Sequence, residues 1–121
     1  MSPKNKMEIH IASDKEMNKA FIEAWHKAEK GTLQEPEEHL YFDDAASLLK
    51  VLSNQRLALL STLFRAGHTS IRALSHELDR DYKNVYDDVQ VLRQAGLIRQ
   101  DSSKKIFVPW SKIHTEIDLA A

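Results

Sequence analysis

The sequence predicts an α+β protein, because two kinds of periodicity share one chain of 121 residues. Short segments near both ends alternate apolar and polar residues, which is typical of strands buried on one face. Between these segments, apolar residues recur at intervals of three and four, which is typical of amphipathic helices. The three glycines, Gly31, Gly67 and Gly96, each follow a helical stretch, where glycine ends a helix in a left-handed conformation without steric cost. We therefore expect several helices between short strands.

The composition fits an ordinary globular protein and excludes several classes. Hydrophobic residues make up 42% and charged residues 29%, and the length fits one domain with a small extension. No apolar run approaches the roughly 18 residues of a membrane span, and the first residues, MSPKNKMEIH, lack the apolar segment of a secretory signal. We therefore expect a cytoplasmic protein with no membrane partner. The absence of cysteine excludes disulfide frameworks, thiol nucleophiles, zinc fingers and thiolate metal sensors.

Residues 1–42 are predicted to form a strand-helix-strand extension. In MEIHIA, the apolar Met7, Ile9 and Ile11 alternate with polar residues, and in HLYF, Leu40 and Phe42 do the same. A helix between them, capped by Ser13 or Asp14, is predicted by an apolar stripe: Met17, Ala20, Phe21, Ala24, Trp25 and Ala28. Because so small an extension cannot bury both faces of its own elements, it should pack on the rest of the chain or on another chain.

Residues 43–121 are predicted to contain helices and a hairpin. The helical segments are DDAASLLKVLS after an aspartate cap, NQRLALLSTLFRAG, TSIRALSHEL with a cap at Thr69 or Ser70, and YKNVYDDVQVLRQAG. The residues expected to face inward are Ala45, Leu48, Leu49, Leu52, Leu57, Leu60, Leu63, Phe64, Ile71, Leu74, Leu78, Val85, Val89 and Leu92. After Gly96, LIRQDSSKKIFVPW reads as a hairpin with a polar turn, and the alternation from Ile113 to Leu119 predicts a last strand.

Helices joined by a tight turn around DRD and followed by a hairpin with a charged tip predict a winged helix-turn-helix. The segment SIRALSHELDRDYKNVYDDVQVLRQAGLI resembles the core of the MarR/ArsR-like winged-helix repressors. The nearest resemblance is to a subgroup of DNA-binding regulators with DYKNV, here Asp81 to Val85, in the recognition helix and VPW, here Val108 to Trp110, at the end of the wing. It covers about residues 7–118. This subgroup often supplies the antitoxin of a toxin-antitoxin pair, and the resemblance implies an extension that is available to bind a toxin.

The charge distribution fits a DNA-facing half joined to an acidic half. The formal net charge is −1, but residues 1–60 hold eight Lys/Arg against ten Asp/Glu, while residues 61–112 hold nine against six. A recognition helix would enter the major groove, and a wing would contact the neighbouring backbone. The expected DNA-binding residues are Ser70, Arg72, Tyr82, Lys83, Asn84, Tyr86, Asp87, Gln90, Arg93, Arg99, Lys104 and Lys105. For Tyr82, packing under the turn is an almost equal alternative, and Lys104 and Lys105 are also typical of a merely soluble turn.

Four aspartates in the predicted recognition region need an explanation, since carboxylates repel phosphate. We expect Asp81 to cap the helix and Asp79 to be a solvated turn residue. Asp88 lies on a flank, where it could pair with a neighbouring cation. Asp87 points outward with Lys83, Gln90 and Gln94, and it could accept a hydrogen bond from cytosine N4 or pair with Lys83 one turn earlier, which we favour.

The apolar face of the extension is the expected contact surface for a homodimer or a partner, with Ile9, Ile11, Met17, Phe21, Trp25, Leu40 and Phe42. The alternative is packing within the chain. His10, His39 and His114 lie on polar faces of predicted strands, but no metal-binding spacing accompanies them. No nucleophile elbow, phosphate loop or paired carboxylates indicate catalysis. We expect no metal, no cofactor and no enzymatic activity.

Together these features predict a sequence-specific DNA-binding regulator of transcription. We expect a homodimeric repressor that binds double-stranded operator DNA, in the manner of an autoregulating antitoxin with a cognate toxin protein. The alternative is a winged-helix protein-interaction module that does not bind DNA.

Overall fold

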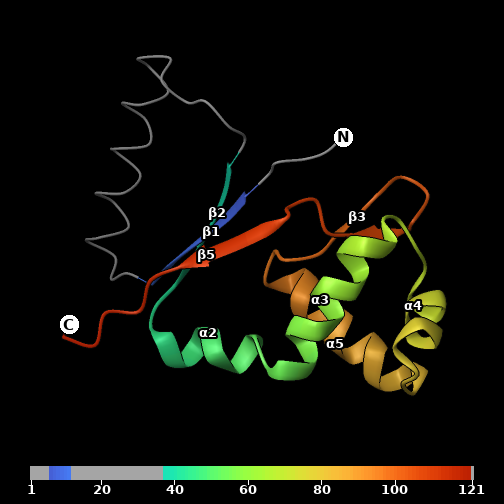
Figure 1. Ribbon diagram of the computed structural model, residues 1–121, viewed down its shortest axis with the longest axis horizontal. Helices are drawn as coiled ribbons and strands as arrows, with labels where there is room; N and C mark the ends of the chain where they lie inside the picture. Colours follow the sequence, from blue (N-terminus) through green and yellow to red (C-terminus); the bar gives the residue numbers. More distant parts are fainter. Residues whose placement is uncertain (1–5, 12–36, 121) are drawn as a thin grey trace, which may run out of the picture. The chain divides into compact units, whose positions relative to one another are not determined.

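The computed structural model describes residues 6–11 and 37–120, and there it shows an α+β fold with four helices and two small sheets (Figure 1). The chain divides into two units. The sheet unit consists of Met1–Leu48 and Trp110–Ala121, and the helical unit is Leu49–Pro109. The helix predicted between the first two strands lies outside the described residues, and so do Met17, Phe21 and Trp25.

The sheet unit contains a three-stranded parallel sheet. Its central strand is β1 (Lys6–Ile11), flanked by β2 (Glu37–Phe42) and by β5 (Lys112–Thr115) from the far end of the chain (Figure 1). Met7 and Ile9 are 1% and 2% exposed, which confirms the predicted alternation in the first strand. The last strand exists but is shorter than predicted, since Ile117 and Leu119 lie beyond it and are exposed.

The boundary between the units falls within α2 (Ala45–Val51). The predicted aspartate cap is confirmed, because Asp44 Oδ1 accepts a hydrogen bond from the Ser47 N–H at 2.8 Å. Leu48 is buried as expected. The prediction that Leu49 faces inward is wrong, since a step of about 100° around the helix leaves its side chain exposed.

The helical unit starts with α3 (Asn54–Ala66), which Ser53 caps by accepting the Arg56 N–H at 3.2 Å. Gly67 ends the helix at φ 77°, where its N–H donates to the Leu63 carbonyl. The buried residues are Leu59, Leu60 and Leu63. The predicted inner face was rotated, because Leu57 and Phe64 are exposed. Closely spaced leucines fit two overlapping stripes, and packing selects the one that contains Leu59.

Two further helices follow, α4 (Ile71–Leu78) and α5 (Tyr82–Gln94). Ser70 caps α4 by accepting the Ala73 N–H at 3.0 Å, and Asp79 ends α4 in the left-handed conformation at φ 54°. Asp79 is exposed, as expected of a solvated turn residue. On α5 the predicted inner residues, Val85, Val89 and Leu92, are all 0% exposed.

A short hairpin completes the helical unit, formed by β3 (Arg99–Gln100) and β4 (Ile106–Phe107). Thr69 adds an antiparallel bridge to Ile106 through two backbone hydrogen bonds of 2.8 and 3.0 Å. The buried hydrophobic core of the unit consists of Leu59, Leu60, Leu63, Leu74, Val85, Val89, Leu92, Leu97, Ile98, Ile106 and Val108. This order of elements is compatible with a winged helix. In the described residues, none of the helices has the length and apolar character needed to cross a membrane.

Candidate nucleic-acid interface

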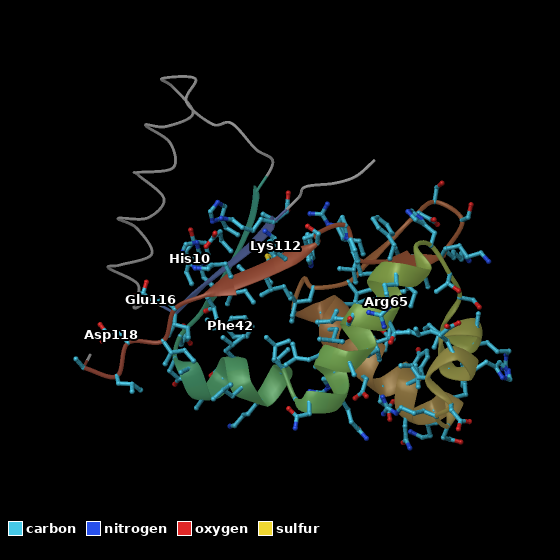
Figure 2. All side chains as sticks on the ribbon, in the orientation of Figure 1. His10, Phe42, Arg65, Lys112, Glu116 and Asp118 are labelled. Carbon is cyan, nitrogen blue, oxygen red and sulfur yellow. The ribbon has the colours of Figure 1, made fainter. Side chains whose placement is uncertain are left out.

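The start of α5 presents polar side chains, because its opposite face is buried in the core. Tyr82, Lys83, Asn84, Tyr86 and Asp87 are all exposed, with 79% of the Lys83 side chain and 57% of the Asp87 side chain accessible. Figure 2 shows the side chains of all described residues. Toward the end of the helix, Gln90 is half-buried, although it was predicted to lie outermost, whereas Gln94 is exposed as predicted. Arg93, predicted on a flank, is half-buried.

Asp87 pairs with Lys83, which is the alternative that the sequence favoured. The Lys83 Nζ lies 3.2 Å from Asp87 Oδ2, one helical turn away. Because the pair is exposed, it contributes at most a few tenths of a kcal/mol to stability, ~0.3 to 0.5. Its larger effect is to neutralise a carboxylate on the surface where α5 is most exposed.

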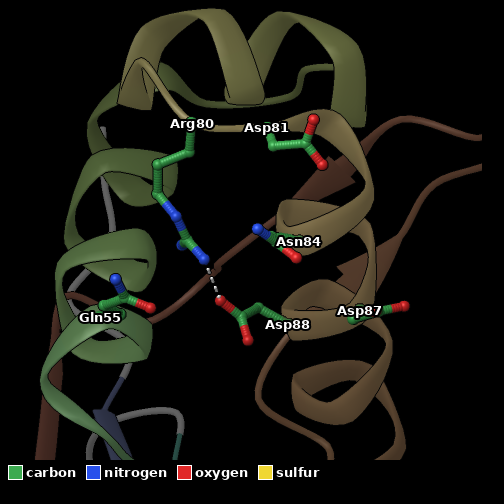
Figure 3. A pocket seen from close by; sticks show the side chains of 6 residues that line it. All are labelled: Gln55, Arg80, Asp81, Asn84, Asp87 and Asp88. Atoms are coloured by element: carbon green, nitrogen blue, oxygen red, sulfur yellow. Dashed lines mark hydrogen bonds and ion pairs between the residues drawn. The ribbon is translucent and has the colours of Figure 1, made fainter.

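Asp88 is held inside the helical unit by two guanidinium groups. Its Oδ2 lies 2.8 Å from Arg80 Nη2 in the turn before α5 (Figure 3). Its Oδ1 lies 3.1 Å from Arg56 Nε on α3. The predicted pairing of Asp88 with a neighbouring cation is confirmed, and two cations share the carboxylate. Arg56 also donates to the carbonyls of Lys50 and Val51, so one side chain connects the end of α2 with α3 and α5.

An open polar cavity of about 370 Å³ lies beside this cluster. It is lined by Gln55, Arg80, Asp81, Asn84, Asp87 and Asp88 (Figure 3). Asp81 occupies the N-cap position of α5, but its side chain makes no capping hydrogen bond, so the prediction of a carboxylate cap is wrong. The ψ of 134° places Asp81 just before the helix, and its carboxylate lines the cavity instead.

The corner between α4 and α5 carries a stacked cation. The guanidinium carbon of Arg72 lies 4.6 Å from the centre of the Tyr82 ring, and the Tyr82 and Tyr86 rings are 6.1 Å apart. Tyr82 therefore supports Arg72 at the surface and does not pack under the turn; its side chain remains 38% exposed. Ser70 uses its hydroxyl to cap α4.

The hairpin tip, Asp101–Lys105, carries the two lysines that the sequence predicts to contact phosphate. Both Lys104 and Lys105 are exposed, and so is Arg99 on β3. Lys104 adopts a left-handed conformation with φ 67°. The Asp101 side chain lies within the turn and accepts hydrogen bonds from the backbone N–H groups of Ser103 and Lys105.

The sheet unit has a polar face on which histidines gather. His10 Nε2 lies 2.8 Å from His39 Nδ1, and the His10 ring stacks on Tyr41 with centroids 4.7 Å apart. His114 and Lys6 both contact the Glu8 carboxylate. Burial raises the pKa of Glu8, but the hydrogen bonds and charges of Lys6 and His114 outweigh it and leave the pKa below its ordinary value of 4.5. Within residues 6–11 and 37–120, no group of three or more potential ligands is arranged to hold a metal ion.

The residues predicted for dimer or partner contacts differ in exposure. Ile9 is 2% exposed. Ile11, Leu40 and Phe42 are half-buried.

The division into units sharpens the charge distribution. The helical unit has ten Lys/Arg and six Asp/Glu, a net charge of +4, whereas the rest of the chain has seven Lys/Arg and twelve Asp/Glu, a net charge of −5. The exposed start of α5 and the hairpin tip therefore belong to the basic part of an almost neutral chain.

Comparison with known proteins adds a family. Residues 51–115, or 65 of the 121 residues, match the family described as HVO_A0114. The chain belongs to the HVO_A0114 family. No curated protein and no solved structure matches the chain significantly. The HVO_A0114 segment begins at the last residue of α2 and ends at the last residue of β5, so it contains the three helices and the hairpin of the helical unit.

Within the HVO_A0114 segment, the sequence predictions missed four residues that shape the candidate interface. Arg56 and Arg80 neutralise Asp88, and His68 and Asp101 organise the hairpin tip. For Asp101 a signal was present, because an aspartate before two serines is typical of a turn in which the carboxylate accepts backbone N–H groups. For the other three residues the partner depends on tertiary packing, which spacing along the sequence does not reveal.

Proposed function

We propose that this protein is a sequence-specific regulator of transcription whose helical unit is a winged helix-turn-helix that binds double-stranded DNA. In this proposal α5 is the recognition helix, α4 precedes it, and the β3–β4 hairpin is the wing. The observation that carries the proposal is the joint exposure of the first turns of α5 and the two wing-tip lysines in a unit of net charge +4.

The chemistry of α5 fits base recognition. The major groove is wide enough for one helix, and its base edges present distinct patterns of donors and acceptors. Asn84 can form paired hydrogen bonds with adenine, and Lys83 can donate to the acceptors of guanine. Asp87 can accept a hydrogen bond from cytosine N4 if Lys83 moves to the DNA. The hydroxyl group of Tyr86 adds a further donor on the same helix.

The arrangement of charges supports phosphate binding. Asp88 and Asp87, two of the six acidic residues in the helical unit, are paired with cations. Arg72, Arg99, Lys104 and Lys105 lie at the surface, where guanidinium and ammonium groups can bind phosphate oxygens. Positioning by phosphate contacts and selection by base contacts are the two requirements of sequence-specific binding.

The wider proposal is a homodimeric repressor that acts in the cytoplasm and binds its own operator as the antitoxin of a toxin-antitoxin pair. Dimerisation would match two half-sites of an operator. The sheet unit would supply the contacts with a second copy or with a toxin protein. Co-purification with the product of the adjacent gene tests the antitoxin proposal, and a clean dimer encoded without such a neighbour would contradict it.

DNA binding itself is tested by titrating the protein with duplex DNA from immediately upstream of its own gene, over a series of salt concentrations. We expect salt-dependent binding. Log K falls with log salt, and each phosphate contact contributes ~0.9 to the magnitude of this slope. Replacing Lys83, Lys104 and Lys105 together by Ala should therefore reduce the magnitude of the slope by about 2 to 3. Lys112→Ala removes an exposed lysine from the sheet unit and serves as the control, with binding unchanged.

Two results would contradict this assignment. If the unchanged protein does not bind DNA even at low salt, DNA binding by α5 is wrong. If the triple variant keeps the affinity and slope of the unchanged protein, the assigned surface is wrong.

The second candidate function is a protein-interaction module without DNA binding. Two observations favour it. Tyr82 and Tyr86 are exposed, and tyrosine is enriched in protein interfaces. The carboxylates of Asp79 and Asp81 are also exposed, and they would repel phosphate. This function predicts capture of a protein partner by α5 in the absence of any salt-dependent DNA binding.

A further inference from the structure

The hairpin tip, Asp101–Lys105, is a turn built around one carboxylate. Asp101 Oδ1 accepts the N–H groups of Ser103 at 2.8 Å and Lys105 at 2.9 Å. The Asp101 N–H donates to the Lys105 carbonyl at 2.8 Å, and the Lys104 N–H donates to the Asp101 carbonyl at 3.0 Å. These four bonds hold Lys104 at φ 67°, a conformation that lysine seldom adopts. The backbone direction at both lysines is therefore fixed by the turn.

Two side-chain contacts connect this turn to the helices. His68, in the connection between α3 and α4, places Nδ1 2.6 Å from Asp101 Oδ2, and its ring stacks on Phe107 with centroids 4.1 Å apart and planes 8° apart. On the other side, Arg93 of α5 donates to Gln100 Oε1 at 3.1 Å, and Gln100 Nε2 donates to the Lys104 carbonyl at 3.2 Å. The tip is thus connected both to the α3–α4 connection and to α5.

We propose that His68 and Asp101 are positioning residues, which hold Lys104 and Lys105 where their ammonium groups meet phosphates of the duplex that α5 reads. The inference rests on the proposed function and adds to it the residues that make the wing a fixed arm. Long lysine side chains lose conformational freedom on binding. Fixing the backbone beneath them reduces what remains to be ordered when the DNA binds.

The ionisation of Asp101 agrees with this role. The hydrogen bond from His68 and those from the backbone N–H groups of Lys105 and Ser103 hold the pKa of Asp101 below its ordinary value of 3.8. The carboxylate is therefore ionised at neutral pH. Its negative charge lies close to Lys104 and Lys105, which we expect to attract phosphate. In this proposal, the hydrogen bonds of Asp101 therefore contribute more to DNA binding than its charge costs.

The charge of Asp101 and its hydrogen bonds should affect DNA binding in opposite directions, so Asp101→Ala distinguishes between them. If Asp101 acts only through its charge, removing it should strengthen binding to a duplex from upstream of the gene. If it positions the lysines, Asp101→Ala should weaken binding, and the slope of log K against log salt should fall by about 1 to 2, the contribution of two phosphate contacts. Asp101→Asn, which keeps a carbonyl oxygen for the Ser103 and Lys105 N–H groups, should restore most of the slope.

The second variant is His68→Phe, which retains an aromatic ring for stacking on Phe107 and loses the hydrogen bond to Asp101. It should also lower the slope, and adding Lys104→Ala and Lys105→Ala to it should lower the slope little further. Ser102→Ala, an exposed change in the same turn, is the matched control and should leave binding unchanged. Circular dichroism verifies that each variant is folded, and His68→Phe carries the test if Asp101→Ala is not.

The outcomes separate this inference from the proposed function. If the unchanged protein does not bind DNA, the proposed function fails, and this inference fails with it. A variant with only Lys104→Ala and Lys105→Ala completes the comparison. If the unchanged protein binds and this lysine variant has a reduced slope, but Asp101→Ala binds more tightly and His68→Phe keeps the full slope, DNA binding stands and the positioning role is wrong. A loss of affinity with an unchanged slope would also overturn it, because that is the result of a general loss of stability.

Discussion

The two units of this chain differ most in how they use charge. The helical unit carries a net charge of +4 and the sheet unit −5, so the overall charge of −1 conceals a strongly divided molecule. In the helical unit, Asp88 is enclosed by two arginines and Asp101 by a backbone turn. A nearly neutral chain can therefore contain a basic unit, because most of its acids lie in the other unit and some of the rest are bonded within the structure.

The polar face of the sheet unit has a different character. Glu8 on β1 is bonded both to Lys6 on the same strand and to His114 on β5. The His10 ring stacks with the rings of His39 and Tyr41 on β2. The net charge of −5 leaves the sheet unit without a surplus of cations for phosphate. We therefore propose that the helical unit binds DNA and that the sheet unit contacts proteins.

The largest effect should come from a cavity in the helical unit. Leu63 is 0% exposed, and Leu63→Ala should lower the free energy of unfolding by about 3 kcal/mol, since a truncated buried leucine loses both transfer energy and packing. Both tryptophans, Trp25 and Trp110, belong to the sheet unit, so their fluorescence reports on that unit. Circular dichroism reports chiefly on the helical unit, because α3, α4 and α5 lie wholly within it. In urea we expect the transition followed by circular dichroism, here called the helical transition, to shift to lower urea. The transition followed by tryptophan fluorescence should keep its midpoint.

A coincident shift of both signals would show instead that the two units unfold together. Met7→Ala, a truncation of a 1% exposed residue of the sheet unit, is the reciprocal control. It should shift the fluorescence transition and leave the helical one.

A smaller loss is expected when the acid enclosed by two arginines is removed. Asp88→Ala leaves Arg56 and Arg80 without their carboxylate, although their side chains are only 21% exposed. Because an unpaired, largely buried charge is costly, we expect a loss of about 2 to 3 kcal/mol in urea unfolding. Asp87→Ala, on the same helix, removes only an exposed pair and should cost about 0.5 kcal/mol or less. Equal losses for the two variants would show that the enclosure of Asp88 adds nothing.

The sequence predicted the parts of the candidate interface that depend on spacing within one helix. Val85, Val89 and Leu92 were identified as the inner face of α5, and the Lys83–Asp87 pair follows from a separation of one turn. These features are local, so the regular geometry of a helix is enough to predict them.

The parts that depend on packing could not be predicted. Arg56 and Asp88 are 32 residues apart, and nothing in the sequence indicates that they meet. The parallel pairing of β5 with β1 was also missed, because alternation identifies a strand but not its neighbour. On α3, the leucines allowed two rotations of the helix, and the predicted one placed Leu57 inward, whereas the structure exposes it to the solvent.

A still smaller effect should show whether Tyr82, at the corner of α4 and α5, supports DNA binding through its ring or through its hydroxyl group. Tyr82→Leu removes the support of Arg72, and an exposed cation–π contact contributes ~0.5 to 1 kcal/mol, so DNA binding should weaken about twofold to fivefold. Tyr82→Phe keeps the ring and should bind as the unchanged protein does. Fluorescence anisotropy with the upstream duplex measures both. If Phe and Leu weaken binding equally, the hydroxyl group is responsible and the stacking is not.

The smallest effect is a response to acid that the two units share, since each has a carboxylate bonded to a histidine. The pKa of Glu8 lies below 4.5 and that of Asp101 below 3.8. A carboxylate with a lowered pKa in the folded state stabilises the fold fully above its unfolded value, and this contribution is lost as the pH falls through the folded value. Both contributions should therefore be complete at neutral pH and disappear on acidification, with that of Glu8 beginning to decline at the higher pH.

Urea midpoints between about pH 6 and pH 3 should fall less steeply for Glu8→Gln in the fluorescence transition and for Asp101→Asn in the helical transition. A midpoint that rises with acidification in either transition would have the wrong sign for these pairs. An effect of Glu8→Gln on the transition followed by circular dichroism would show that the two units unfold together.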